Sequence, residues 1–229
     1  EEKVSVVPSA PSVFQSILNT ADLDVSALAS MRLAVTGAAA VPVQMILDMK
    51  ERLGFETVAV GYGLTECSGT ATMTRHDDPV EKIANSSGRP IPDVEVRIAD
   101  DAGNEVARGE QGEVLIRGYQ VMLGYFDAPE QTAETIDADG WLHTGDVGIM
   151  NPDGYLKITD RTKDMFIVGG FNAYPAEIES LMSEHPDIAQ ASVVGVPDER
   201  MGEVGYAFVV LRPGAATTAE EIKGWAKGH

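Results

Sequence analysis

The chain has 229 residues, 44% of them hydrophobic, which is enough for one large domain or two smaller domains with packed cores. Its 17 Lys and Arg against 36 Asp and Glu leave a formal net charge of −19, which would repel nucleic acid and anionic membranes. The single cysteine, Cys67, cannot form an internal disulfide, and the four histidines lack metal-ligand spacing. Nucleic-acid binders, disulfide scaffolds and zinc enzymes are therefore disfavoured.

The sequence carries no sign of membrane insertion or secretion. No run approaches about 18 consecutive apolar residues, and the first twenty residues lack a basic start followed by an apolar run. We therefore expect a cytoplasmic protein without an integral membrane segment. The chain starts at Glu1 without a methionine and stops at His229 inside an amphipathic pattern, so we also expect a fragment of a longer protein.

The first third of the chain alternates strand and helix patterns. Residues 32–36 form a short β-rich run, apolar residues recur at helical spacing over 43–53, and a second β run covers 57–60. This β-α-β order predicts a parallel sheet. We interpret residues 1–87 as the α/β part of a large N-terminal domain.

From about Gly88 the pattern changes to short β runs separated by turn residues. These runs cover 94–98, 114–117, 141–150 and 155–159, with turn clusters at 100–104 and 151–154. Short strands punctuated in this way are typical of antiparallel sheets. Residues 88–160 are therefore predicted to form a small antiparallel β subdomain.

A third segment begins after residue 160. Pro175, followed by Glu177 and Glu179, is typical of a helix start, because proline fits the first turn and carboxylates favour the positive end of the helix dipole. Two β runs follow at 191–196 and 206–211, and a second helix is predicted from about Ala219. Residues 161–229 are interpreted as a hinge and an incomplete α+β C-terminal domain.

The segment 61–66, Gly-Tyr-Gly-Leu-Thr-Glu, directly follows an apolar strand, where open α/β sheets place their ligands. Its glycines would let the backbone approach a flat ligand beside Tyr62. Thr65 offers a hydroxyl, and Glu66 offers an oxygen ligand suited to Mg²⁺. The alternative is an ordinary strand-to-helix turn capped by Thr65.

Three other segments could complete a site. Residues 36–40 present only small side chains after the preceding strand, and they could form the opposite wall or simply pack. Asp146 follows a glycine and could accept both hydrogen bonds of a ribose diol. Arg161 supplies a cation near the predicted boundary. Alternatively, both charges belong to a solvated surface ion pair.

In this order, these segments resemble the adenylate-forming superfamily, which includes acyl-CoA synthetases, peptide-synthetase adenylation domains and beetle luciferases. Further similar stretches lie at 112–118 leading to 124–125, at 169–172 leading to 175–179, and at 185–188 before 193–198. The resemblance covers nearly the whole chain. It implies a fragment of the acyl-CoA synthetase fold.

The resemblance also implies roles for individual residues. The implied nucleotide-binding residues are Gly37, Ala38, Ala39, Gly61, Tyr62, Gly63, Thr65, Asp146 and Arg161. Among these, Thr65 would contact the α-phosphate, and Asp146 and Arg161 would hold the ribose. Glu66 would bind Mg²⁺, so Thr65 and Glu66 are implied to be catalytic.

Other positions are implied to serve the second half of the reaction. Lys163, also implied to be catalytic, matches the hinge about which the C-terminal domain swings. Gly169 and Gly170 match a loop that lines the pantetheine tunnel for coenzyme A. The implied wall of the acyl pocket covers residues 67–71, and its named members are Cys67, Ser68 and Gly69.

The implied activity is that of an ATP-dependent acid–CoA ligase that uses Mg²⁺ and coenzyme A on a fatty or bulky carboxylic acid. Oligomer formation is left open. An amino-acid adenylation domain and a non-catalytic adenylate-binding module are the alternatives. The family's phosphate loop is expected upstream of Glu1 and its adenylation lysine downstream of His229, so we expect the 229-residue chain alone to be inactive.

Overall fold

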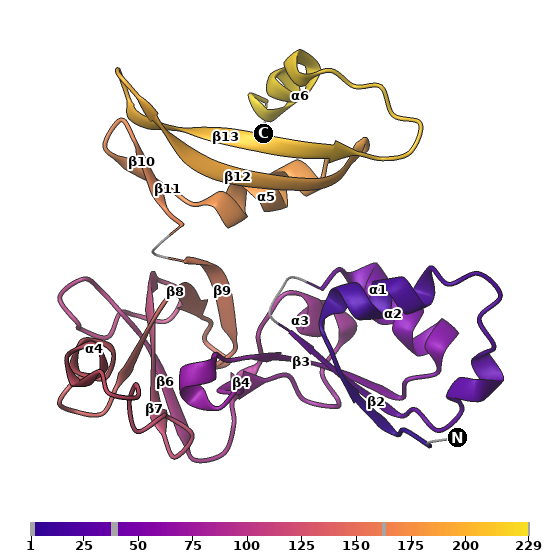
Figure 1. Ribbon diagram of the computed structural model, residues 1–229, viewed down its shortest axis with the longest axis horizontal. Helices are drawn as coiled ribbons and strands as arrows, with labels where there is room; N and C mark the ends of the chain where they lie inside the picture. The colour runs from indigo at the N-terminus through magenta and orange to yellow at the C-terminus, as the bar shows by residue number, and fades with distance from the viewer. Residues whose placement is uncertain (1–2, 38–40, 162–163, 229) are drawn as a thin grey trace. The chain divides into compact units, whose positions relative to one another are not determined.

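The computed structural model describes residues 3–37, 41–161 and 164–228, and the chain divides into two compact units (Figure 1). The first unit comprises the residues up to Thr144 together with Gly148–Ile158. The second comprises Gly145–Val147 and the residues from Thr159 onward. Within the described ranges, no helix is both long enough and apolar enough to cross a membrane.

The first unit begins with a five-stranded sheet whose strands follow chain order. They are β1 (Val6–Pro8), β2 (Leu33–Gly37), β3 (Thr57–Tyr62), β4 (Thr72–Met73) and β5 (Arg89–Pro90). The first three strands are parallel, which confirms the predicted parallel sheet. The short strands β4 and β5 add an antiparallel edge that the sequence pattern did not reveal.

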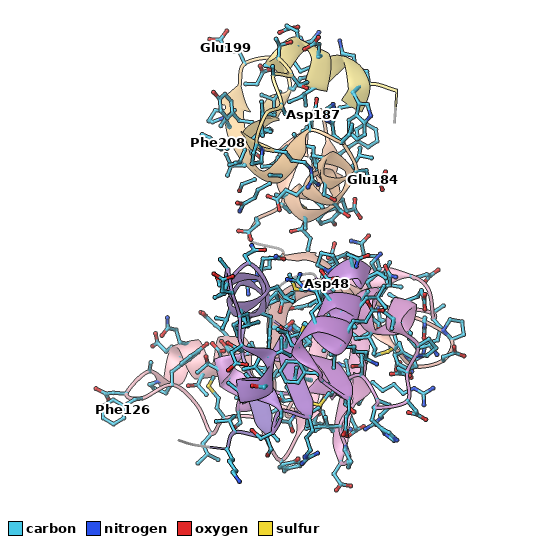
Figure 2. The ribbon with its side chains drawn as sticks, turned by 90° about the vertical axis from the view of Figure 1, so that its right-hand side faces the viewer. Asp48, Phe126, Glu184, Asp187, Glu199 and Phe208 are labelled. Carbon is cyan, nitrogen blue, oxygen red and sulfur yellow. The ribbon has the colours of Figure 1, made fainter. Side chains whose placement is uncertain are left out.

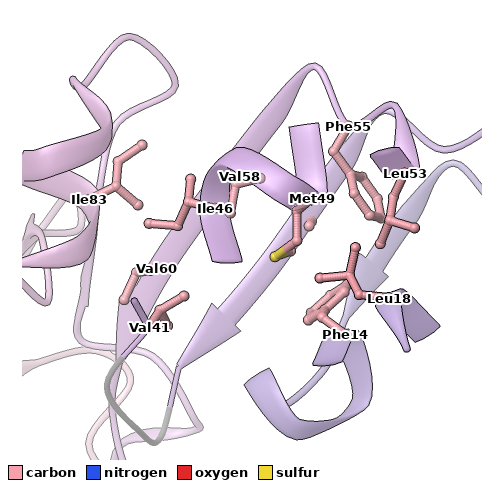
Figure 3. Close-up of a cluster of buried hydrophobic side chains, with 11 residues drawn as sticks. Phe14, Leu18, Val41, Ile46, Met49, Leu53, Phe55, Val58, Val60 and Ile83 are labelled. Atoms are coloured by element: carbon pink, nitrogen blue, oxygen red, sulfur yellow. The ribbon is translucent and has the colours of Figure 1, made fainter. Parts of the chain in front are cut away.

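Helices α1 (Pro11–Leu18), α2 (Val43–Leu53) and α3 (Val80–Ala84) pack with this sheet around one hydrophobic core (Figure 3). On α2, Ile46, Met49 and Leu53 recur at helical spacing and are almost fully buried. The helix ends at Gly54, whose left-handed φ of 77° suits glycine. The predicted helix over 43–53 is confirmed.

A four-stranded sheet follows, in the order β6-β7-β8-β9. Its strands are β6 (Val94–Ala99), β7 (Gln111–Gly118), β8 (Leu142–Met150) and β9 (Leu156–Arg161), with helix α4 (Pro129–Thr135) between β7 and β8. Strands β6 and β7 pair antiparallel. On β6, Val94, Val96 and Ile98 are buried and point to one face, as period-two alternation requires. All four predicted β runs lie in or overlap these strands.

The second unit holds another four-stranded sheet, in the order β11-β10-β13-β12. Its strands are β10 (Phe166–Val168), β11 (Phe171–Ala173), β12 (Ile188–Asp198) and β13 (Gly202–Leu211). Helices α5 (Pro175–Ser183) and α6 (Ala219–Ala226) confirm the two predicted helices. Its core is formed by Phe166, Met182, Ile188, Val193 and Ile222.

Candidate functional site

A hollow of about 260 Å³ lies in the first unit, at the carboxyl ends of the parallel strands β2 and β3. Its lining residues are Ser9, Ala10, Val35, Thr36, Gly37, Gly61, Gly63, Gly69, Thr70 and Met73. Ligands of open α/β sheets bind at this edge of the sheet. The structure therefore brings Gly37, Gly61, Gly63 and Gly69, all of them predicted site residues, to one hollow.

Close backbone contacts explain the glycines. A Cβ atom on Gly37 would lie 2.1 Å from the carbonyl oxygen of Gly61, and one on Gly63 would lie 2.5 Å from that of Gly69. Neither position can hold a side chain without moving the backbone. At these two glycines the hollow is therefore lined by main-chain atoms alone. Ala38 and Ala39, which were predicted to continue this wall, lie outside the described residues.

Thr36, which the sequence analysis named only as part of the segment 36–40, adds a polar group. Thr36 lines the hollow and is only 3% exposed, and its Oγ1 has no hydrogen-bond partner in the described part of the chain. A buried hydroxyl without a partner is unfavourable until something binds to it. Ser9, Ala10, Val35 and Met73 also line the hollow and were not predicted as site residues.

The turn after β3 is stabilised by its own cysteine. The amide of Leu64 donates to Sγ of Cys67 at 3.3 Å, and the thiol donates back to the Leu64 carbonyl oxygen at 3.4 Å. Cys67 is fully buried among the core side chains beneath the β6–β9 sheet. Of residues 67–71, which were assigned to an acyl pocket, Gly69 and Thr70 line the hollow, and neither Cys67 nor Ser68 does.

Tyr62 and Thr65 differ in exposure. Tyr62 is half-buried and packs against the same core as Cys67. Thr65 opens a short 3-10 turn, Thr65–Cys67, and its side chain is exposed. The turn therefore offers the Thr65 hydroxyl to solvent while it keeps the Cys67 thiol inside.

Glu66 is held at both its backbone and its side chain. Its carbonyl oxygen accepts a hydrogen bond from the Met122 amide at 2.8 Å, and its Oε1 accepts one from the Tyr125 hydroxyl at 2.8 Å. This hydrogen bond raises the pKa of Tyr125 above its ordinary value of 10.0, and partial burial and the charge of Glu66 act in the same direction. The sequence analysis had included Tyr125 in a family-like stretch without a role.

The residues around Glu66 are compatible with Mg²⁺ that arrives with a nucleotide. No group of three metal-ligating side chains occurs among the residues with described positions. Mg²⁺ is often bound by one or two carboxylates together with substrate phosphates, so a single carboxylate suffices. Oε2 of Glu66 has no hydrogen-bond partner within the described ranges, while Oε1 is occupied by Tyr125.

In the second unit, Asp146 and Arg161 form an ion pair. Nε of Arg161 lies 3.2 Å from Oδ1 of Asp146, and the two side chains are 71% and 9% exposed, respectively. They lie on the neighbouring strands β9 and β8. The structure thus brings together the two residues that were predicted to hold a ribose. Lys163, the predicted hinge residue, lies outside the described residues.

Gly169 and Gly170 form the turn between β10 and β11. Their φ angles are +58° and +89°, the left-handed region that two-residue hairpin turns require. The Gly169 amide donates to the Met201 carbonyl oxygen at 2.8 Å, which ties the turn to the start of β13. Both glycines are exposed.

Comparison with known proteins places this site in a family. Residues 1–126 match the family of AMP-binding enzymes, and residues 177–229 match the C-terminal domain of AMP-binding enzymes. The chain is 50% identical over 227 residues to a 3-(7a-methyl-1,5-dioxo-octahydro-1H-inden-4-yl)propanoyl:CoA ligase of Rhodococcus jostii, covering 99% of this chain and 42% of that protein. It is 40% identical over 228 residues to a mitochondrial medium-chain acyl-CoA ligase of Homo sapiens. That match covers 99% of this chain and 37% of the human protein.

A solved structure shares the fold. This is the o-succinylbenzoate-CoA synthetase of Bacillus subtilis, solved in complex with its acyl-adenylate intermediate. It matches this chain with a TM-score of 0.82 and 30% identity, and the match covers 99% of this chain and 45% of the synthetase chain. The chain therefore spans less than half the length of each of these proteins. Because the AMP-binding match alone covers more than half of the 229 residues, the chain belongs to the family of AMP-binding enzymes.

Proposed function

We propose that the protein to which this chain belongs is an ATP-dependent acid–CoA ligase that releases AMP. The observation that carries this proposal is the hollow at the ends of β2 and β3, whose walls are the backbone of Gly37, Gly61 and Gly63. A carboxylate, Glu66, follows three residues later on a fixed turn. A flat base and a charged phosphate group could bind side by side there.

Each part of the nucleotide is assigned to residues of this chain in the proposal. Those that surround the adenine are Gly37, Ala38, Ala39, Gly61, Tyr62 and Gly63. Asp146 accepts hydrogen bonds from the ribose diol, because a carboxylate is an acceptor with two oxygens. Arg161, which is paired with Asp146, holds that carboxylate in its orientation.

The first reaction forms an acyl-adenylate. The carboxylate oxygen of the acid attacks the α-phosphorus of ATP, and the bond to the β-phosphate breaks with release of pyrophosphate. The exposed Thr65 hydroxyl donates a hydrogen bond to an α-phosphate oxygen as negative charge develops there. Bound Mg²⁺, held by Glu66, would neutralise phosphate charge during the transfer.

The second reaction forms the thioester. The CoA thiol, losing its proton, attacks the acyl carbon, and AMP leaves with the bonding electron pair. Gly169 and Gly170 are proposed to line the passage for pantetheine, where an exposed turn without side chains permits close approach. Lys163 is proposed as the hinge between the two reaction states.

The acid is proposed to be bulky and largely apolar. A fused bicyclic propanoate is the first candidate, because the Rhodococcus jostii relative, 50% identical, acts on such an acid. A medium-chain fatty acid is the second candidate, because the human relative, 40% identical, is a medium-chain ligase. Gly69, which lines the hollow beside Thr70 and Met73, is the proposed link between the nucleotide and acyl parts of the site.

A pyrophosphate-release assay tests the proposal. The full-length protein is incubated with ATP, Mg²⁺, CoA and a panel of bicyclic propanoates, medium-chain fatty acids, aromatic acids and amino acids. We expect pyrophosphate and acyl-CoA with the first two classes. Turnover with amino acids only would favour an amino-acid adenylation domain, and ATP binding without turnover of any acid would favour a non-catalytic adenylate-binding module.

A further inference from the structure

The loop that follows β7 turns one aromatic side chain back toward the Glu66 turn. In residues 119–126, Tyr119, Leu123 and Phe126 are exposed by 73%, 103% and 100%. Phe126 points away from the body of the first unit (Figure 2). Tyr125 is only 37% exposed, and its hydroxyl donates to Oε1 of Glu66 at 2.8 Å.

Backbone contacts fix this loop against the turn. The Met122 amide donates to the Glu66 carbonyl oxygen at 2.8 Å, and the Ser68 hydroxyl donates to the Gln120 carbonyl oxygen at 2.9 Å. These two bonds would remain if the Tyr125 hydroxyl were removed. The phenol therefore acts on a carboxylate whose backbone is already held in place.

Helix α4 fixes the other end of the loop. The Tyr125 amide donates to Oγ1 of Thr132 at 2.9 Å. A Cβ atom on the preceding residue, Gly124, would lie 2.7 Å from Cγ2 of Thr132, so the loop packs closely on the helix. The position of the phenol is thus set by α4, and the phenol in turn restrains the glutamate.

We propose that Tyr125 is a positioning residue for Glu66, an inference that rests on the proposed function of Glu66 as the carboxylate that binds Mg²⁺ with ATP. The hydrogen bond occupies Oε1 and leaves Oε2 for the cation. A free glutamate side chain loses much rotamer freedom when it binds a ligand. A hydrogen bond that holds the glutamate before the ligand binds removes part of this entropic cost. Hydrogen bonds to metal-binding carboxylates commonly act in this way.

The test compares Tyr125→Phe with Tyr119→Phe in the full-length protein. Both variants lose one phenol hydroxyl from the same loop, but the Tyr119 side chain is 73% exposed and no hydrogen bond of its hydroxyl is seen among the described residues. ATP affinity is measured by calorimetry without any acid, once with Mg²⁺ and once with a chelator. We expect Tyr125→Phe to reduce the Mg²⁺-dependent gain in ATP affinity about tenfold, with metal-free affinity unchanged.

A second readout separates positioning from support of the loop. Hydrogen exchange at the Met122 amide, measured without nucleotide or metal, reports whether the loop still contacts Glu66. Tyr125→Phe should leave this exchange as in the wild type, and Tyr119→Phe should change neither measurement.

Three results would overturn the inference. They are an unchanged Mg²⁺-dependent gain in Tyr125→Phe, an equal loss of ATP affinity with and without Mg²⁺, and faster exchange at Met122. The proposed function is judged separately, by pyrophosphate release from the wild type. A protein that binds ATP more tightly with Mg²⁺ but turns over no acid would contradict the ligase proposal and leave the Tyr125 measurement interpretable.

Discussion

Gly37 and Gly61 are directly paired residues of the parallel strands β2 and β3, and a Cβ atom on Gly37 would lie 2.1 Å from the Gly61 carbonyl oxygen. The two glycines are thus paired in the sheet, and both also line the hollow. The pairing of the two strands and the shape of the hollow therefore both depend on the close packing of these two backbones. A substitution at Gly37 should disturb both.

Gly37→Ala is expected to lower the free energy of unfolding by about 1–3 kcal/mol, because the strands must separate to admit the methyl group. The control is Gly224→Ala in α6, where a Cβ atom would meet nothing within 4 Å. That change should raise stability by about 0.5–1 kcal/mol, since alanine is the better helix former. Urea unfolding of both variants checks the prediction, and equal stability of Gly37→Ala and wild type would contradict it.

Thr36→Val tests the buried Thr36 hydroxyl, which lacks a partner among the described residues. The change removes a buried group that lacks a hydrogen bond within the described ranges, so the ligand-free protein should become more stable by about 1 kcal/mol. Thr72→Val is the matched control, because Thr72 is fully buried and its hydroxyl donates to the Ser87 carbonyl oxygen at 2.5 Å. The free energy of unfolding of Thr72→Val should fall by about 1–3 kcal/mol. Losses of similar size in both variants would show that the Thr36 hydroxyl has a partner.

Part of the fold could be predicted because its longer strands are bounded by turn residues. The β6–β9 sheet and helix α2 have clear periodicity. The three-residue strands β10 and β11 were missed, because they are too short to show alternation, although Gly169 and Gly170 marked their turn. Strands β4 and β5, with two residues each, give no pattern at all.

The site could be predicted only in part. Gly37 and Gly61 were identifiable because each lies at or near the end of a β run. The contact between Glu66 and Tyr125 could not be predicted from the sequence. It joins residues 59 positions apart and depends on the packing of a loop against α4. The inward direction of Cys67 is likewise set by the 3-10 turn, which composition does not reveal.

Tyr155 should make stability depend on pH in the alkaline range. Its hydroxyl donates to Oδ1 of Asp78 at 2.5 Å, and that bond, together with burial and the charge of Asp78, raises the pKa of Tyr155 above 10.0. The folded state therefore favours the neutral phenol. Its stabilising contribution is complete below the unfolded value of 10.0 and is lost as pH rises through the higher folded pKa.

Tyr155→Phe checks this expectation. At neutral pH the free energy of unfolding of the variant should be about 1 kcal/mol lower, because the hydrogen bond is lost. Above about pH 10 its stability should fall less steeply than that of the wild type. Tyr206→Phe is the control, because that side chain is 56% exposed. Urea unfolding from about pH 8 to pH 11 provides the measurement. Parallel pH profiles of Tyr155→Phe and wild type would exclude the assignment.

Arg161→Gln separates a role in binding from a role in stability. The Arg161 side chain is 71% exposed, so its ion pair with Asp146 should contribute less than about 1 kcal/mol. The KM for ATP in the full-length protein should nevertheless rise about tenfold, because a charged group that is proposed to hold the ribose is lost. Arg117→Gln, which removes the pair with Glu95 at 2.9 Å, should leave this KM unchanged. Equal KM values in all three proteins would remove Arg161 from the nucleotide site.

Glu66→Gln tests the proposed Mg²⁺ ligand. The substitution keeps the shape of the side chain but removes its charge, so adenylation by the full-length enzyme should slow by about 10²-fold or more. Glu134→Gln, on the exposed side of α4, is the charge-matched control and should be unaffected. The rate of acyl-adenylate formation is measured by rapid quench at saturating Mg²⁺. An unchanged rate in Glu66→Gln would exclude Glu66 as the Mg²⁺ ligand.

The double variant Glu66→Gln with Tyr125→Phe then shows whether the tyrosine acts through the glutamate. If the phenol serves only to hold Oε1, its removal should cost nothing further once the carboxylate has been replaced, because the two losses share one interaction. The four rates of the cycle should therefore be strongly non-additive, with the double variant as slow as Glu66→Gln alone. Additive losses, with each substitution slowing adenylation by its full factor in the presence of the other, would show that Tyr125 contributes to the reaction independently of Glu66.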